Sequence, residues 1–282
     1  MKRQQQKNKD LILLVKKDRE KLEQEKAALR DVVGALGGGD KMTLIKLNTI
    51  NQCIFIIDKL LNYDFKALEK MPLKITTHGG KLTGINSLST LKTHNNLCIK
   101  NGKNKRSVCF HCYVNKYLKY YSQLEYTLLY NTLILKYTNL SKYNTPLINA
   151  NIFRLESFSD LQNKQHLKNL IKIVKYNNTC LFSLWTKNYE IIKDYIKQEN
   201  TPKNLNIIIS SFYLNKAVSN GFINLLKSYN HTRKNQIKTF TVYTQDFIKE
   251  NNIKINCGAR SCLKCGLCYS RKNVSELNEI LK

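Results

Sequence analysis

Four cysteines lie within twelve residues near the end of the sequence, in the segment NCGARSCLKCGLCY (256–269). They are Cys257, Cys262, Cys265 and Cys268, with the spacing C-x4-C-x2-C-x2-C. Two cysteines separated by two residues can bind one metal ion, because the turn between them brings both sulfurs within about 2.3 Å of it. The spacing therefore predicts a metal or cluster site, and disulfide pairs are the alternative.

A second group of three cysteines lies upstream, in NLCIKNGKNKRSVCFHCY (96–113). Cys98, Cys109 and Cys112 have the spacing C-x10-C-x2-C, and His111 stands between the last two. In one interpretation, Cys109 and Cys112 join two downstream cysteines in a four-thiolate zinc site. Such a site would hold distant parts of the domain together and perform no chemistry.

The downstream spacing also overlaps two iron–sulfur patterns. Cys257, Cys262 and Cys265 fit C-x4-C-x2-C, and the last three cysteines fit C-x2-C-x2-C. A third thiolate from one turn crowds a lone zinc ion, whereas each iron of a cluster can accept one. We therefore predict an iron–sulfur cluster of the 4Fe–4S type, with zinc as the alternative. If the upstream cysteines held a separate cluster, its fourth iron would be open to a substrate or to S-adenosylmethionine.

No segment of the sequence is typical of membrane insertion or secretion. The longest aliphatic runs are LILLV (11–15) and IFII (54–57), far below the roughly 20 apolar residues that span a bilayer. The N-terminal apolar stretch is too short and too closely followed by charge for a signal peptide. We expect a soluble protein in the cytoplasm of a host cell, where clustered cysteines are more often metal ligands than disulfides.

The chain is strongly basic, with 47 Lys and Arg against 20 Asp and Glu and a net charge of +27. Such a surface repels itself unless a polyanion screens it, and nucleic acid is the commonest one. The alternative is that the Lys- and Asn-rich composition reflects AT-rich DNA. Tyrosines in KYLKYY (116–121) could stack on bases, or they could be ordinary helix-surface residues. The candidate nucleic-acid contacts are Lys103, Lys105, Arg106, Lys116, Lys119, Arg233 and Lys234.

Residues 8–36 are predicted to form a helix, because apolar residues recur every seven positions at Val15, Leu22, Leu29 and Leu36. Asp18 and Glu25 interrupt the second apolar position of the same repeat. The helix could pair with a partner protein, pack on the body or stand in solvent. The segment GGGD (37–40) is a plausible hinge. We therefore divide the chain into an N-terminal helical extension, residues 1–40, and a basic α/β domain with cysteine-rich loops, residues 41–282.

Strand and helix patterns alternate in the second half of the chain. Strands are predicted at 147–157, 179–186, 204–212 and 237–244, and helices at 161–177 and 189–199. This order implies right-handed crossovers and a parallel sheet. The predicted fold is α/β, either a partial barrel or an open parallel sheet, with a Cys-rich site and an N-terminal helix. The Gly-rich segment THGGKLTG (77–84) lacks the spacing of a phosphate-binding loop and is expected to be a turn.

Polar residues follow the apolar runs at the ends of the predicted strands. In parallel α/β folds, functional residues gather at the C-terminal ends of the strands. A possible pocket there would be formed by Arg154, Glu156, Trp185, Lys187 and Ser210. Polar residues after a strand are also typical of any solvent-facing loop, so the set is a better candidate than any single member.

Five segments in order are similar to the Gene product 88 family of phages and mobile elements. They are VCFHCY (108–113), FRLESFSDL (153–161), LFSLWTK (181–187), NLNIIISSF (204–212) and NCGARSCLKCGLCY (256–269). The resemblance covers roughly residues 90–270 and excludes the N-terminal helix. It implies that the seven cysteines described above are the family's cysteines and that Arg154 is its strand arginine. It implies a mobile-element origin and a metal site, and no particular activity.

Three functions are compatible with these patterns. The first is a metal- or iron–sulfur-binding protein of a phage or mobile element that associates with nucleic acid. The second is a radical-type or redox enzyme with a 4Fe–4S cluster on a barrel-like fold. The third is a noncatalytic, zinc-stabilised interaction protein whose N-terminal helix docks on a partner. The sequence shows no pair of a nucleophile and a base that would define a reaction.

Overall fold

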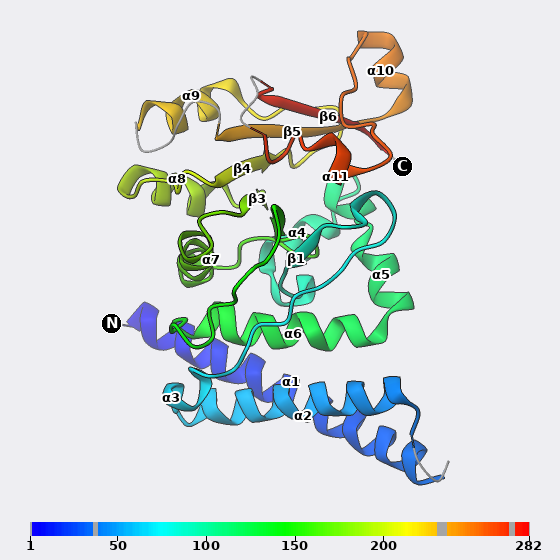
Figure 1. Cartoon of the computed structure of the whole chain (residues 1–282), viewed down its shortest axis with the longest axis vertical. Coiled ribbons are helices and arrows are strands. Elements are labelled where there is room, and N and C mark those ends of the chain that lie inside the picture. The colour runs from blue at the N-terminus through cyan, green and yellow to red at the C-terminus, as the bar shows by residue number, and fades with distance from the viewer. Residues whose placement is uncertain (1, 36–38, 230–235, 271–273, 282) are drawn as a thin grey trace.

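Six parallel strands form one sheet in a computed structural model that describes residues 2–35, 39–229, 236–270 and 274–281 (Figure 1). The strands are β1 (Asn86–Leu88), β2 (Ile152–Leu155), β3 (Leu181–Thr186), β4 (Leu205–Ser210), β5 (Ile237–Tyr243) and β6 (Glu276–Ile280). The α-helices are α1 (Lys2–Ala35), α2 (Lys41–Leu61), α3 (Phe65–Leu68), α4 (Asn96–Gly102), α5 (Val114–Tyr120), α6 (Ser122–Tyr137), α7 (Lys164–Tyr176), α8 (Tyr189–Gln198), α9 (Asn220–Ser228), α10 (Gln245–Asn251) and α11 (Cys262–Cys265). Short 3-10 helices are η1 (Gly80–Leu82), η2 (Lys92–His94) and η3 (Val108–His111).

The strands are hydrogen-bonded in sequence order, from β1 at one edge to β6 at the other. Each crossover therefore runs in the same direction, and right-handed crossovers then place the connecting helices on one face of the sheet. In Figure 1, α7, α8 and α9 lie together on the left of the sheet, and α5 and α11 lie on the right. The predicted α/β fold with a parallel sheet is confirmed, and the sheet is open.

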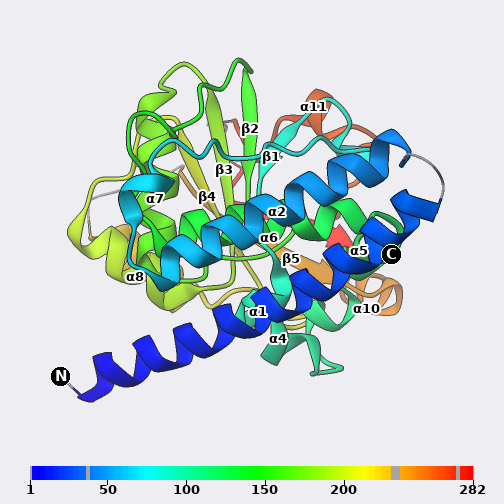
Figure 2. The same ribbon diagram turned by 90° about the horizontal axis from the view of Figure 1, so that it is seen from below.

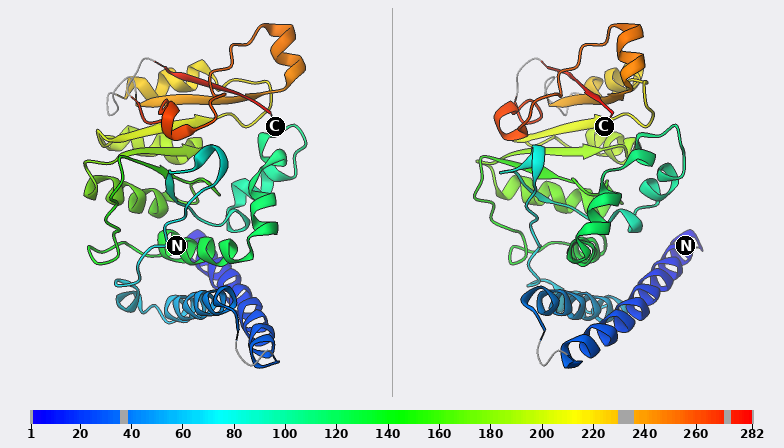
Figure 3. Two further views of the ribbon diagram at one scale, coloured as in Figure 1. Left: turned by 45° about the vertical axis from the view of Figure 1, so that its right-hand side comes forward. Right: turned by 90° about the vertical axis from the view of Figure 1, so that its right-hand side faces the viewer.

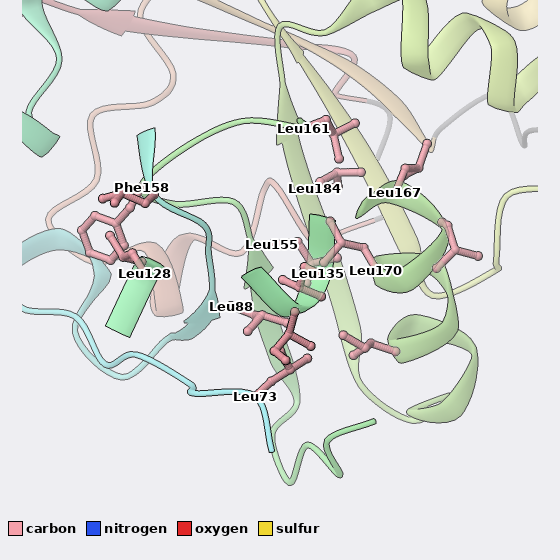
Figure 4. Close-up of a cluster of buried hydrophobic side chains, with 14 of the residues drawn as sticks. Leu73, Leu88, Leu128, Leu135, Leu155, Phe158, Leu161, Leu167, Leu170 and Leu184 are labelled. Atoms are coloured by element: carbon pink, nitrogen blue, oxygen red, sulfur yellow. The ribbon is translucent and has the colours of Figure 1, made fainter. Parts of the chain in front are cut away.

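One face of the sheet is apolar and forms the main core. Leu88, Leu155 and Leu184 are register partners on β1, β2 and β3, and all three are buried. In Figure 4 they meet leucines of α6 and α7, such as Leu135 and Leu170. The burial of these leucines fixes the side of the sheet on which the helices pack.

The opposite face of the sheet is polar near β1 and β2 and apolar toward β6, where Ile208, Phe240, Val242 and Leu277 form a second buried cluster. Because side chains alternate along a strand, the neighbours of the core leucines point away from α7. Ser87, Arg154, Ser183 and Asn206 form one row across β1, β2, β3 and β4. We call this side the polar face. The segment that carries the downstream cysteines packs on it.

The N-terminal helix α1 packs on the body of the protein. It lies beside α2 (Figure 2), and Val15 and Leu22 are each only 2% exposed within the main core. The two acidic residues that interrupt its heptad pattern contact the body: Asp18 accepts a bond from His94 Nε2 at 2.7 Å, and Glu25 accepts one from the Tyr126 hydroxyl. Leu36 and part of the GGGD segment lie outside the described residues. No helix in the described ranges is both long and apolar enough to cross a membrane.

We predict that Leu22→Ala lowers the free energy of unfolding by about 2–5 kcal/mol, because it leaves a cavity between α1 and the core. Leu13 lies on the same helix but is 72% exposed, so Leu13→Ala is a matched control with an expected change below about 0.5 kcal/mol. Urea unfolding followed by circular dichroism measures both. Equal effects of the two substitutions would show that α1 does not pack on the body in solution.

Candidate metal centre and polar face

The downstream cysteine segment lies on the polar face of the sheet, between α10 and β6. The Cys257 amide donates to the Asn278 carbonyl of β6 at 2.9 Å, and Asn206 Nδ2 of β4 donates to the Cys268 carbonyl at 3.0 Å. The segment therefore crosses from the edge strand toward the middle of the sheet. Figure 3 shows α11 on the opposite side of the sheet from α8 and α9.

A short helix brings the downstream cysteines to one pocket. Ser261 caps α11 by accepting a bond from the Lys264 amide, and Gly266 ends it with a φ of 61°. Glycine adopts this left-handed conformation without steric cost, so the chain can reverse after the helix. All four downstream cysteines line this pocket, together with Lys81, Ala259, Leu267, Tyr269 and Leu277.

Positive charges lie beside these thiols. Lys81 Nζ lies 3.4 Å from Cys257 Sγ and 2.7 Å from Glu279 Oε1. Burial tends to lower the pKa of Lys81, but the bond to Glu279 outweighs it and raises that pKa above its usual value. Burial raises the pKa of Cys268 to about 12, and the charge of Arg154 partly opposes this effect. Lys81 lies in the turn predicted at 77–84, and nothing in the sequence placed it near the cysteines.

The upstream cysteines form a separate group at the C-terminal edge of the sheet. Cys98 lies in α4, Cys109 in η3, and Cys112 caps η3. The Val108 amide donates to the Phe212 carbonyl at 3.0 Å, which joins this segment to the chain that follows β4. Burial raises the pKa of Cys98 well above its usual range, and the charges of Asp160, Cys109 and Cys112 raise it further.

The two cysteine groups do not converge on one point. The pocket of the downstream cysteines is lined by none of the upstream ones. Across the described ranges, which include all nine cysteines, every cysteine is a free thiol, and no three His, Cys, Asp or Glu side chains are already arranged to hold a metal ion. The four downstream thiols thus border a pocket, and the upstream three form a neighbouring group. His111, between Cys109 and Cys112, is exposed.

The five residues of the possible sheet-end pocket are placed differently from one another. The Arg154 guanidinium carbon lies 4.3 Å from the centroid of the Trp185 ring, so these two are brought together. Glu156 is buried and contacts His166 at 3.2 Å. The Lys187 amide donates to Asp160, and the Ser210 carbonyl accepts from Tyr189. None of these three contacts involves Arg154 or Trp185.

Five of the seven candidate nucleic-acid contacts are exposed side chains around the upstream cysteines. They are Lys103, Lys105, Arg106, Lys116 and Lys119. The exposed aromatic residues Phe110, Tyr120 and Tyr213 lie on the same segments or beside them, since the Leu214 amide bonds the Arg106 carbonyl. Arg233 and Lys234 lie outside the described residues.

His78 is a polar-face residue that the sequence did not single out. Its Nε2 lies 2.7 Å from Ser87 Oγ, and its ring stacks on Phe158 with centroids 5.0 Å apart. Burial, with a smaller contribution from the Arg154 charge, lowers the pKa of His78 to about 4. The folded state therefore binds a proton at this ring less readily than the unfolded state does.

We expect this histidine to make the protein less stable in acid. Above about pH 6.5 the His78 ring is neutral in both the folded and the unfolded state, and its contribution to the free energy of unfolding is complete. As the pH falls toward 4, the ring takes up a proton in the unfolded state only, so this contribution is lost. The stability difference between the wild type and His78→Gln should therefore shrink over this range. Urea unfolding at intervals between pH 7.5 and 4 measures it, and a difference independent of pH would contradict the prediction.

A parallel α/β sheet with two groups of cysteines, one on its polar face and one at its C-terminal edge, defines the class of this chain. A sequence model of the Gene product 88 family matches residues 65–271, and the chain belongs to that family. The match begins after α2 and so leaves out α1, as the resemblance in the sequence indicated. No curated protein and no solved structure matches the chain.

Proposed function

We propose that this chain is an iron–sulfur protein that holds its cluster through Cys257, Cys262, Cys265 and Cys268. The observation that carries the proposal is that all four thiols line one pocket on the polar face. Thiolates bound to a metal centre leave an excess of negative charge, and a cation that donates a hydrogen bond to them stabilises it. Lys81, within 3.4 Å of Cys257 Sγ, supplies such a cation.

The arrangement of the thiols favours iron over zinc. A lone zinc ion requires four ligands within about 2.3 Å of a single point. The irons of a 4Fe–4S cluster are separate attachment points, so its thiolates can stand around a pocket. The four thiols here border a pocket, and three of them come from a stretch of seven residues. Three thiolates so close in sequence suit the separate irons of a cluster better than a single tetrahedral ion.

A bound cluster would supply one-electron transfer at the polar face, and the chain's own residues would tune it. Lys81 would donate to the Cys257 sulfur, and hydrogen bonds to thiolates are among the features that set the potential of such clusters. The apolar side chains of Leu267 and Leu277 border the same pocket and would limit the access of water.

Anaerobic purification tests this function directly. We expect brown protein with a broad absorption near 400 nm that fades on reduction. Metal analysis should give iron and inorganic sulfide in equal amounts. Colourless protein with stoichiometric zinc would reject the iron–sulfur proposal and leave the zinc-stabilised interaction protein.

We propose nucleic-acid binding as an associated function, supported by the exposed basic and aromatic side chains around the upstream cysteines. Single strands bind to such surfaces through phosphate neutralisation and base stacking. Binding to a labelled single strand should weaken steeply with salt, by a log–log slope of about −0.7 for each phosphate neutralised. Lys103→Ala together with Lys105→Ala should make the slope shallower, and Lys66→Ala, an exposed lysine of α3, should leave it unchanged. Equal slopes for all three proteins would reject the surface.

A radical-type enzyme is the second candidate, favoured by the order of the strands. A sheet whose parallel strands follow one another in sequence has the strand order of a β/α-barrel wall, although here the sheet is open. The upstream cysteines follow the first strand of this wall and number three, which would leave one iron of a 4Fe–4S cluster open. Reductive cleavage of S-adenosylmethionine by the reduced protein would establish this candidate, and an inert reduced protein would reject it.

A further inference from the structure

Arg154 holds a positive charge on the polar face without a partner of opposite charge. Its side chain is half-buried, and its Nε is fully buried without a hydrogen-bond acceptor. A buried donor without an acceptor is costly, so the unpaired Nε of Arg154 calls for an explanation. The explanation must lie among the neighbouring residues or in a ligand.

The acids of the surrounding segments are already bonded to other groups. Glu279 of β6 accepts from Lys81 at 2.7 Å. Asp160 accepts from the Thr186 hydroxyl and the Lys187 amide, and Glu156 accepts from Thr90 at 3.1 Å. No carboxylate in the described part of the chain pairs with Arg154.

The aromatic partner of Arg154 also has an unsatisfied donor. Trp185 lies with its ring centroid 4.3 Å from the guanidinium carbon, and its indole Nε1 is buried without an acceptor. Arg and Trp side chains carry only donors, so neither can satisfy the other. A group that satisfies both must offer at least two hydrogen-bond acceptors.

The net charge of the polar face points to the same kind of ligand. Lys238 is 1% exposed, and its Nζ donates to the Val274 carbonyl at 2.9 Å. Lys81 already bonds Glu279, so both lysines have acceptors within the chain. Arg154, by contrast, has no hydrogen-bond acceptor within the described part of the chain, so its donors are available to a ligand.

We propose that Arg154 and Trp185 form a binding site for an oxyanion group, a carboxylate or a phosphate, of a small-molecule ligand. The planar guanidinium binds such groups through two parallel hydrogen bonds. The guanidinium carbon of Arg154 lies 4.3 Å from the centroid of the indole ring, a cation–π contact that helps to hold the side chain in place. Neither donor belongs to a cysteine, although the charge of Arg154 also acts on Cys262 and Cys268.

The single tryptophan of the chain makes the site directly measurable. Trp185 is the only tryptophan, so its fluorescence reports on its contact with Arg154. The full chain, as purified anaerobically, is titrated with inorganic phosphate, with acetate and with sodium chloride at constant ionic strength. We expect a saturable change with phosphate or acetate and none with chloride, and the tighter of the two identifies the oxyanion. Identical responses to all three salts would overturn the proposal.

Variants of Arg154 distinguish an oxyanion-binding role from a role in compensating the negative charge of a bound cluster. Arg154→Gln should weaken the saturable binding at least tenfold. Arg154→Lys should also weaken it, because lysine keeps the charge but loses the planar pair of donors. Arg106→Gln is the matched control at an exposed arginine and should bind as the wild type does. If Arg154→Gln changed the metal content or the absorption spectrum while oxyanion binding stayed intact, the proposal would be wrong. The metal content of the wild type tests the iron–sulfur proposal, and oxyanion binding tests the Arg154–Trp185 site. Either proposal can therefore fail without the other.

Discussion

Cys262→Ser combined with Cys268→Ser is expected to lower the iron content of the purified protein by more than about tenfold, since even weaker perturbations around a metal cost ten- to hundred-fold in affinity. The two residues line the pocket from α11 and from the chain after Gly266. Serine keeps the size of the side chain and removes the thiolate. Because two of the four anchors are lost, the remaining pair should not hold a cluster.

The control for this variant is a cysteine outside both groups. Cys180 is fully buried in the main core, where its thiol has no role in the pocket. Cys180→Ala should therefore keep the wild-type iron content per folded chain. Upstream, Cys109→Ser together with Cys112→Ser shows whether that group holds metal of its own. Unchanged iron in the Cys262/Cys268 double variant would contradict the assignment of the downstream pocket.

His166→Ala is expected to lower the free energy of unfolding by about 3–5 kcal/mol, the cost of removing one partner of a buried ionisable pair. His166 Nε2 and Glu156 Oε1 lie 3.2 Å apart, and both side chains are 0% exposed. Glu156 follows β2 with a φ of 58°, a conformation that non-glycine residues hold only where the surroundings enforce it. Without the histidine, the buried Glu156 carboxyl group would lose its contact at Oε1 and keep the one from Thr90 at Oε2.

A double-mutant cycle tests the pair itself. Glu156→Ala combined with His166→Ala should cost less than the sum of the two single changes, because the second substitution removes the group that the first left unpaired. Lys168→Ala, at an exposed position of the same helix, should shift stability by less than about 0.5 kcal/mol. Additive single effects in urea unfolding would show that the pair makes no specific interaction.

The central strands were predictable because their sequences carry long apolar patterns. β3, β4 and β5 are six or seven residues long and largely buried, and each lies within its predicted range. β1 has three residues and begins with an exposed asparagine, and β6 contains two glutamates and an asparagine. One of these edge strands is very short and the other is polar, so neither sequence has the apolar run that identifies a buried parallel strand.

The candidate site was predictable where local sequence determines it. The spacing of the downstream cysteines indicated their pocket. Strand ends indicated Arg154 on β2 and Trp185 on β3, which lies two residues beyond Ser183, the register partner of Arg154. Lys81 could not be assigned, because its contact with Cys257 joins residues 176 positions apart. The sequence also could not predict which side of α1 packs on the body, because the partners of Asp18 and Glu25 lie far along the chain, in η2 and α6.

Anomalous X-ray scattering at the iron edge, from crystals grown without oxygen, tests the central claim most directly. The account predicts strong iron peaks in the pocket between α11 and β6, bonded to the sulfurs of Cys257, Cys262, Cys265 and Cys268. Four reduced sulfurs with no metal density between them, or the same sulfurs joined in disulfides, would contradict it.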